Sequence, residues 1–126
     1  MAVDVFRAVL EYVEGRGRFS SNSVDREYFS QWRDRAPADT DFDEFITYHA
    51  WLVIEGGFAE GSRSTLNRGQ GHLAHIDNLT NAGHDFIESA RRPGIWRQGI
   101  AKVGGSAPEV VAAVMRDLVV KAVTGG

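Results

Sequence analysis

Apolar residues recur at helical spacing in the first segment of the chain. Over residues 4–14 they follow the spacing i, i+1, i+4, i+5 and i+8, at Val5, Phe6, Val9, Leu10 and Val13. This spacing places them on one face of an α-helix. Gly15 and Gly17 come next, and glycine commonly follows the last helical residue. The pattern therefore predicts an amphipathic helix over residues 4–14 and a turn over residues 15–18.

Two more helices are predicted before residue 58. In residues 25–35 the apolar side chains again recur at helical spacing, and Pro37 closes the segment. Thr40 or Asp41 then caps a third helix, because either side chain can accept from free N–H groups of its first turn. The glycines at 56–57 end this helix. Its apolar stripe consists of Phe42, Phe45, Ile46, His49, Leu52 and Val53.

The sequence after the third helix predicts a β-hairpin. A short strand over residues 58–60 precedes a glycine- and serine-bearing loop over residues 61–71. Residues 73–79 are expected to form the returning strand. The hairpin would thus span about residues 58–79.

Three short helices are predicted after the hairpin. Thr80 caps a fourth helix that ends near residue 91, and the Pro-Gly pair at 93–94 breaks the chain. A fifth helix is expected over residues 95–103. The last helix begins at Ser106, which forms a capping box with Glu109, and runs to about residue 123.

The order of three helices, a hairpin and further helices predicts the fold class. It is mainly α with a small β-hairpin, and it is typical of a winged helix, a variant of the helix-turn-helix. Residues 1–91 are expected to form the winged-helix core. Residues 92–126 would add a C-terminal helical extension within the same domain.

Two stretches carry a resemblance to a known family. Residues 46–58, Ile-Thr-Tyr-His-Ala-Trp-Leu-Val-Ile-Glu-Gly-Gly-Phe, look like the third helix of winged-helix domains and the start of the wing. Residues 79–87, Leu-Thr-Asn-Ala-Gly-His-Asp-Phe-Ile, are followed by Ala90, Arg91 and Trp96. Together they resemble an uncharacterised family of phage and prophage proteins, a domain of unknown function. The resemblance implies a winged-helix fold and a mobile-element origin, but no reaction.

The second stretch also has a physical interpretation. Thr80 can accept from the backbone N–H groups of the following turn. Gly83 would let that turn approach another backbone segment closely, since it has no Cβ. Phe86 and Ile87 would then dock the fourth helix on the core.

Composition and charge limit the classes of function. The 126 residues are 43% hydrophobic and 25% charged, as in ordinary folded proteins. The absence of cysteine excludes disulfides, thiolate zinc sites and cysteine nucleophiles. No apolar run is long enough to span a bilayer, and the N-terminal residues lack a signal pattern, so we expect a cytoplasmic protein without a membrane partner.

No motif in the chain points to catalysis, a cofactor or a metal. The four histidines, His49, His72, His75 and His84, form no compact ligand pattern. We expect His49 and His84 to lie at the edge of the core. The sequence has no nucleophile elbow and no phosphate-binding loop. We therefore predict a non-enzyme.

The third helix is expected to present the partner-binding face. Residues 41–60 contain five acidic residues and no Lys or Arg, which suits a protein interface better than a DNA-reading helix. Trp51 has two open alternatives, since it can be an exposed anchor or fold back into the core. The residues predicted to face outward are Glu44, Thr47, Tyr48, Trp51 and Glu55.

The hairpin points to a different partner. Residues 61–73 hold Arg63, Arg68 and His72 and no acid, a composition that could contact phosphates. This supports an alternative function as a small DNA-binding regulator. The net charge of −3 argues against it, because nucleic-acid binders often carry a basic excess.

The last predicted helix is apolar on more than one face. Packing against a single neighbour would leave valines in water, so the helix is either buried between Trp96 and the first helix or forms a two-fold interface. Of these we favour a homodimer through Val110, Val114 and Leu118, because so small a domain can hardly cover the helix on all sides. The sequence thus favours a phage-type module that binds a host protein stoichiometrically. Inhibition of a defence or transcription system is one form that this action could take.

Overall fold

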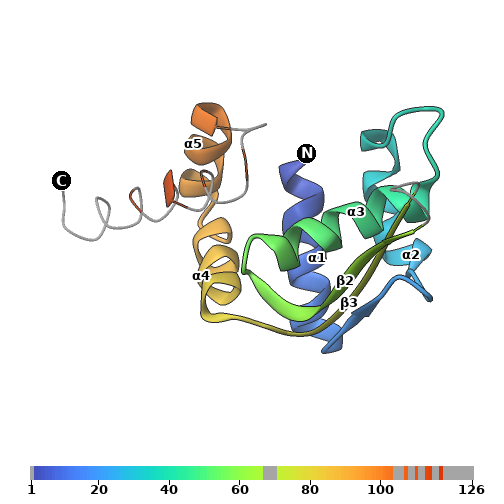
Figure 1. Ribbon diagram of the computed structural model, residues 1–126. Helices are drawn as coiled ribbons and strands as arrows, with labels where there is room; N and C mark the ends of the chain where they lie inside the picture. The colour runs from blue at the N-terminus through green and yellow to red at the C-terminus, as the bar shows by residue number, and fades with distance from the viewer. Residues whose placement is uncertain are drawn as a thin grey trace.

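The computed structural model describes residues 2–66 and 71–103, together with residues 107, 110, 113, 114 and 117. The described chain is mostly helical and carries a small antiparallel sheet of three strands (Figure 1). Helix α1 (Val3–Arg16) lies in the middle and is contacted by α3 (Phe42–Glu55) and α4 (Asn81–Ala90). The mainly helical class predicted from the sequence is confirmed.

Helix α1 forms where the apolar spacing predicts it. The side chains of Val5, Phe6, Val9 and Leu10 are fully buried. Gly17 ends the helix with a φ of 91°, and its N–H donates to the carbonyl of Val13 at 2.7 Å. Because L side chains rarely adopt such a φ, glycine is the residue suited to this end.

A short strand that the sequence did not predict follows α1. Strand β1 (Phe19–Ser20) pairs antiparallel with β3 (Gly71–Leu79), with Phe19 opposite Ile76. The sheet order is β1-β3-β2, so β3 is the central strand. Two residues are too few to show a hydrophobic alternation, which explains why the prediction missed this strand.

The predicted helix over residues 25–35 is wrong as a continuous element. Helix α2 (Arg26–Phe29) passes into a 3₁₀ helix, η1 (Ser30–Arg35), and the backbone departs from helical angles at Trp32. Tyr28 packs on Tyr12 of α1 with 5.0 Å between ring centroids, and it also lies 6.0 Å from the ring of Trp32. We infer that this aromatic packing, rather than helical period, sets the backbone here.

The hairpin is longer than predicted. Strand β2 (Ala59–Leu66) pairs with β3 along its length, so the expected loop over residues 61–71 is wrong for 61–66 and for Gly71. The register shifts between Glu60 and Gly61. A Cβ on Gly61 would lie 1.9 Å from the carbonyl oxygen of His75, so a glycine allows the strands to pair at this bulge.

The three-helix order predicts that the third helix packs across the second, but α3 instead packs mainly on α1 and β3. Ile46 and Val53 are fully buried, and Phe45 and Leu52 are partly buried. Its contacts with α2 and η1 lie near its first turn, where Arg26 pairs with Asp43 at 2.8 Å.

Helix α4 is fixed to the turn after α3 by backbone groups. Thr80 donates from its hydroxyl to the carbonyl of Gly57 at 2.7 Å and accepts from the N–H of Gly83 at 3.2 Å. A Cβ on Gly83 would lie only 2.1 Å from the carbonyl oxygen of Phe58. These contacts confirm the predicted roles of Thr80 and Gly83, and we call these four residues the α4 joint.

The last described helix begins earlier than predicted. Helix α5 (Pro93–Val103) includes the Pro-Gly pair that was expected to break the chain. Proline fits the first helical position, because its missing N–H would have no intrahelical partner there. Ile95 is buried in the same core cluster as α1 and α4, so α5 packs on the common core.

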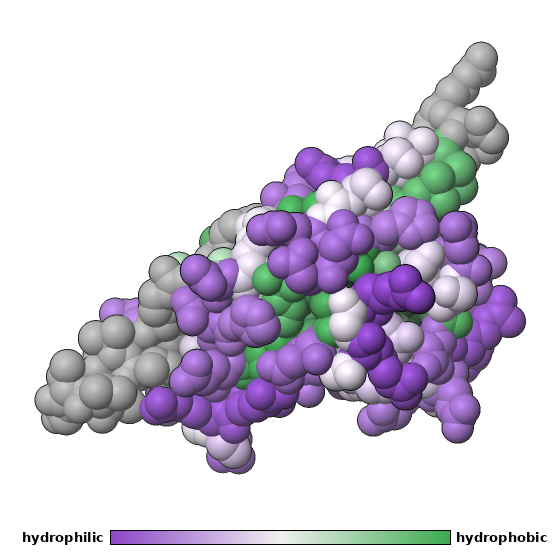
Figure 2. All heavy atoms as spheres, turned by 90° about the horizontal axis from the view of Figure 1, so that it is seen from below, coloured by the Kyte–Doolittle hydropathy of each residue, from purple (hydrophilic) through white to green (hydrophobic). Residues whose placement is uncertain are grey.

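The surface is mostly hydrophilic on the face seen from below in Figure 1. Figure 2 shows hydrophobic side chains there in a central band between hydrophilic ones and in a smaller patch at the upper right. Exposed large apolar side chains among the described residues are Tyr48, Leu66 and Val110. Tyr48 belongs to α3, where the sequence predicted a partner-binding face.

Candidate functional site

The N-terminal turn of α3 positions the first residue of the candidate site. Asp41 caps the helix, since its carboxylate accepts from the N–H of Glu44 at 3.2 Å. Of the two predicted caps, Asp41 is therefore the one used. The Glu44 side chain extends from this turn toward the start of β3.

Glu44 holds the start of β3 against α3. Its carboxylate accepts from the backbone N–H of His72 at 3.1 Å and lies 2.5 Å from the ring Nδ1 of the same residue. The His72 ring stacks on Tyr48, with centroids 5.1 Å apart and an angle of 14° between the planes. The edge of Trp51 meets the same ring at 5.4 Å. One imidazole thus joins three side chains of α3.

Arg63 of β2 covers the other end of this group. Its guanidinium lies 4.4 Å from the centre of the Trp51 ring and 3.7 Å from the carboxylate of Glu55. This position combines a cation–π contact with an ion pair. The arginine expected to contact phosphates therefore already has two contacts within the chain. We call Glu44, Tyr48, Trp51, Glu55, Arg63 and His72 the α3–β3 surface.

Trp51 lies between the two alternatives left open by the sequence. Its side chain is partly buried under His72 and Arg63. Its indole Nε1 is buried and donates to no acceptor among the described residues. Tyr48 is 37% exposed and is the aromatic side chain that α3 presents most openly.

The prediction that Thr47 faces outward is wrong. Its side chain is only 3% exposed, because α3 turns this position toward the interior. Both α1 and β3 contact this helix, so two of its sides are covered. The predicted outward face assumed a single buried stripe and therefore included too many residues. The outward face comprises Tyr48 and Glu55, with Glu44 and Trp51 at its edge.

His49 lies beneath this surface and is more deeply buried than the core-edge position that the sequence predicted. Its Nε2 accepts from the backbone N–H of Ala2 at 3.0 Å, and its Nδ1 lies 2.8 Å from the carbonyl of Phe45. These partners require a proton on Nδ1 and none on Nε2. Burial lowers the pKa of His49 and so favours this neutral form.

A cavity of about 510 Å³ opens beside the α3–β3 surface. Arg35, which borders it, pairs with Asp4 of α1 at 2.9 Å. The walls combine aromatic, aliphatic and charged groups, a composition that accepts a single large side chain or a small ligand. The lining residues are Ala2, Arg35, Pro37, Thr40, Glu44, Phe45, Tyr48, His49 and His72.

The remaining histidines lie apart from this cavity. His75 is within 3.0 Å of the Ser20 hydroxyl, on the sheet, and His84 is exposed on α4. The expectation that His84 lies at the edge of the core is therefore wrong. Within the described part of the chain, no three potential metal ligands come together.

Other predicted site residues have different positions. Arg68 and Leu118 lie outside the described residues. Val110 is 44% exposed, whereas Val114 is partly buried against the core. The homodimer through this segment stays a prediction. None of the helices in the described ranges has the length and apolar character that crossing a bilayer requires.

No short sequence pattern connects His72 with α3. The signal was present only in part, as a lone histidine next to a predicted strand. Its contact with Glu44 depends on where β3 starts. The prediction of a loop over residues 61–71 placed the start of this strand too late. Arg35 and Pro37 were likewise missed, because they reach the cavity from a segment of irregular backbone.

Comparison with known proteins agrees with the resemblance to an uncharacterised domain. No curated protein and no solved structure matches the chain. The family of hypothetical proteins DUF2513 matches residues 2–107, a range that includes the whole α3–β3 surface and the α4 joint. The chain therefore belongs to the DUF2513 family of hypothetical proteins.

Proposed function

We propose that the chain is a non-enzymatic winged-helix module of phage type that binds a host protein stoichiometrically through the α3–β3 surface. The observation that carries the proposal is the exposed face of α3. It presents Tyr48, which lines a cavity of about 510 Å³, and Glu55 at the far end of the helix, where the neighbouring Arg63 is already paired. Aromatic anchors next to a recess are typical of protein interfaces.

The element order supports the winged-helix assignment. A helix, a short strand, three helical segments (α2, η1 and α3) and a hairpin follow one another, and β1 pairs with the returning strand of the hairpin. In a DNA-binding domain of this type, α3 would read bases with Arg, Lys, Asn or Gln. Here the helix has none of these residues, which favours a protein partner.

The chemistry of the surface also limits the partner. Glu55 and Glu44 give it carboxylates, and the exposed ring of Tyr48 provides an apolar contact. A complementary partner would present a basic rim and one large side chain for the cavity. Inhibition of a host defence or transcription protein would follow if the chain covers a site on that protein. This last step rests on the phage-type resemblance.

The decisive experiment compares two charge reversals. Tagged wild-type protein is used to capture partners from a host lysate, and each captured protein is then purified for a binding assay. Glu55→Lys and Tyr48→Ala should each weaken a specific complex, with Tyr48→Ala costing on the order of 2 kcal/mol, about 30-fold in Kd. Glu88→Lys, an exposed reversal on α4, should leave binding unchanged. Light scattering should give a fixed stoichiometry.

A DNA-binding assay run in parallel tests the alternative. On the proposal, duplex binding is weak, non-specific and only slightly dependent on salt, because few phosphates are neutralised. A nanomolar, sequence-selective complex that Arg63→Ala and Arg68→Ala abolish would overturn the proposal. So would a partner that binds Glu55→Lys and Glu88→Lys equally well.

A further inference from the structure

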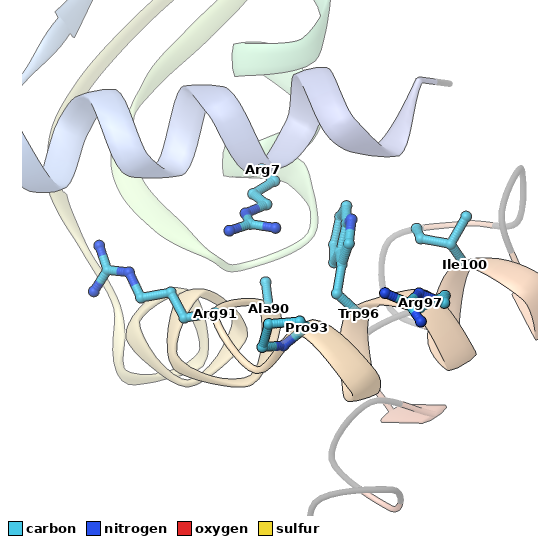
Figure 3. A pocket seen from close by; sticks show the side chains of 7 residues that line it. All are labelled: Arg7, Ala90, Arg91, Pro93, Trp96, Arg97 and Ile100. Atoms are coloured by element: carbon cyan, nitrogen blue, oxygen red, sulfur yellow. The ribbon is translucent and has the colours of Figure 1, made fainter.

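A second cavity, of about 440 Å³, lies between α1, α4 and α5 and is separate from the α3–β3 surface. Figure 3 shows Arg7 reaching into it from α1, with the Trp96 ring standing opposite and Ala90 and Pro93 along one side. Ile100 and Arg97 of α5 complete the lining together with Arg91. The volume is in the range of ordinary ligand pockets.

The cavity combines an apolar wall with three arginines, Arg7, Arg91 and Arg97. Trp96 packs edge-on against the buried Phe86, with centroids 6.3 Å apart, so its ring is held by the core. The Arg7 guanidinium lies over the same ring at 4.8 Å. This arrangement presents a flat aromatic surface with a charged group at its face.

The carboxylates of α1 orient two arginines but leave donors unused. Arg7 binds Glu11 through Nε, so no hydrogen bond within the described chain uses its two terminal nitrogens. Arg91 gives both terminal nitrogens to Glu14. Arg97 has no ionic partner among the residues that the structure describes. The unused donors of Arg7 and Arg97 can therefore bind an anionic group.

We infer that this cavity binds a small organic anion, with an aromatic or aliphatic body against Trp96 and Ile100 and a carboxylate or phosphate on Arg7 and Arg97. The charge of the lining selects the anionic group, since guanidinium matches carboxylate and phosphate oxygens. The apolar wall selects an organic body over a bare ion. This site is independent of the proposed partner surface.

Titrations of the full chain with simple probes test the inference. Phenyl phosphate, benzoate, benzyl alcohol and inorganic phosphate are added to ¹⁵N-labelled protein, and the indole N–H signals are followed by NMR. The Trp96 signal is assigned with Trp96→Phe. We expect one or both aromatic anions to shift it saturably, at least about tenfold more tightly than benzyl alcohol or inorganic phosphate. The stronger of the two anions identifies the preferred head group.

Two arginine variants provide the matched control. Arg97→Ala should weaken binding of the preferred anion at least about tenfold, because it removes a charge-assisted donor. Arg92→Ala removes an exposed arginine next to the cavity but outside its lining, and should leave binding unchanged. Several results would overturn the inference: no saturable shift at Trp96, equal binding of benzyl alcohol or of inorganic phosphate, or equal effects of the two variants.

Discussion

The α4 joint and the α3–β3 surface both border α3, yet they are made of different chemical groups. In the joint, main-chain atoms of Gly57, Phe58 and Gly83 approach one another, with the Thr80 hydroxyl between them. In the surface, half-exposed aromatic and charged side chains contact one another while the backbones stay apart. The first arrangement has almost no freedom to change, whereas the second could be replaced by simpler residues.

This difference distinguishes the residue types that the fold requires from those that it does not require. Backbone contact at Gly83 fixes one residue type, because any Cβ would collide with the Phe58 carbonyl. The partly exposed contacts of Tyr48 with His72 and of Glu55 with Arg63 place a much weaker demand on residue type. Residues that the fold does not require are the better candidates for function, and the predictions below test this division.

The largest effect is expected in the joint. Gly83→Ala should destabilise the protein by about 3 kcal/mol or more, because the added methyl would lie 2.1 Å from a backbone oxygen and α4 must shift. The measurement is the free energy of unfolding in urea. Gly15→Ala is the matched control, since a Cβ there meets nothing within 4 Å inside α1.

The control variant Gly15→Ala should increase the free energy of unfolding, whereas Gly83→Ala should decrease it. Alanine is favoured over glycine in a helix by roughly 0.5–1 kcal/mol, so Gly15→Ala should be slightly more stable than wild type. If Gly83→Ala and Gly15→Ala have similar stability, the close approach in the joint does not exist in solution.

The next effect concerns His49, which lies beneath the α3–β3 surface. Burial lowers its pKa in the folded protein, so the unfolded chain binds a proton first as the pH falls below 6.5. Stability is therefore full above that pH and decreases below it, by up to about 1.4 kcal/mol per pH unit, until His49 protonates in the folded state. Urea unfolding at a series of pH values measures this slope.

His49→Gln gives the comparison for the pH series. Glutamine keeps an acceptor for the Ala2 N–H but does not titrate. The other three histidines remain in both proteins, so the difference between the two slopes reports His49 alone. Identical slopes would mean that His49 is not buried in its neutral form.

A smaller effect is expected at the cap of α4. Thr80→Ala should cost about 1 kcal/mol, since it removes the acceptor for the Gly83 N–H and the donor to the Gly57 carbonyl. Thr80→Ser keeps the hydroxyl and should retain most of the stability. A serine variant as unstable as the alanine variant would attribute the effect to the methyl group instead.

The sequence predicted the joint much better than the surface, for a physical reason. A cap and a glycine act on the backbone within one turn, so the spacing Thr80-x-x-Gly83 carries the information locally. Helices α1 and α3 were likewise predicted from periodicity, and the buried Val5, Leu10 and Ile46 follow it. These features depend on neighbours close in sequence.

The rest depends on contacts between distant segments. The β1–β3 pairing, the length of β2 and the meeting of His72 with Glu44 all follow from strand register, which short sequence patterns do not specify. The same limit applies to Thr47, which is buried on a helix that both α1 and β3 contact.

The smallest effect is expected for the pair of Glu44 and His72. It tests most directly whether residues of the α3–β3 surface are present for folding or for binding. A double-mutant cycle with Glu44→Gln and His72→Gln should give a coupling of only about 0.5 kcal/mol, because both side chains are partly exposed to solvent. Glutamine at 44 still offers an oxygen to the backbone N–H of His72, so the start of β3 stays in place. Each variant should therefore fold, which allows binding assays on the α3–β3 surface to be interpreted.

A coupling above about 2 kcal/mol, comparable to a buried network, would make this pair a part of the folding core. In that case its residue types would be explained by stability, and the argument that they are present for a partner would fail.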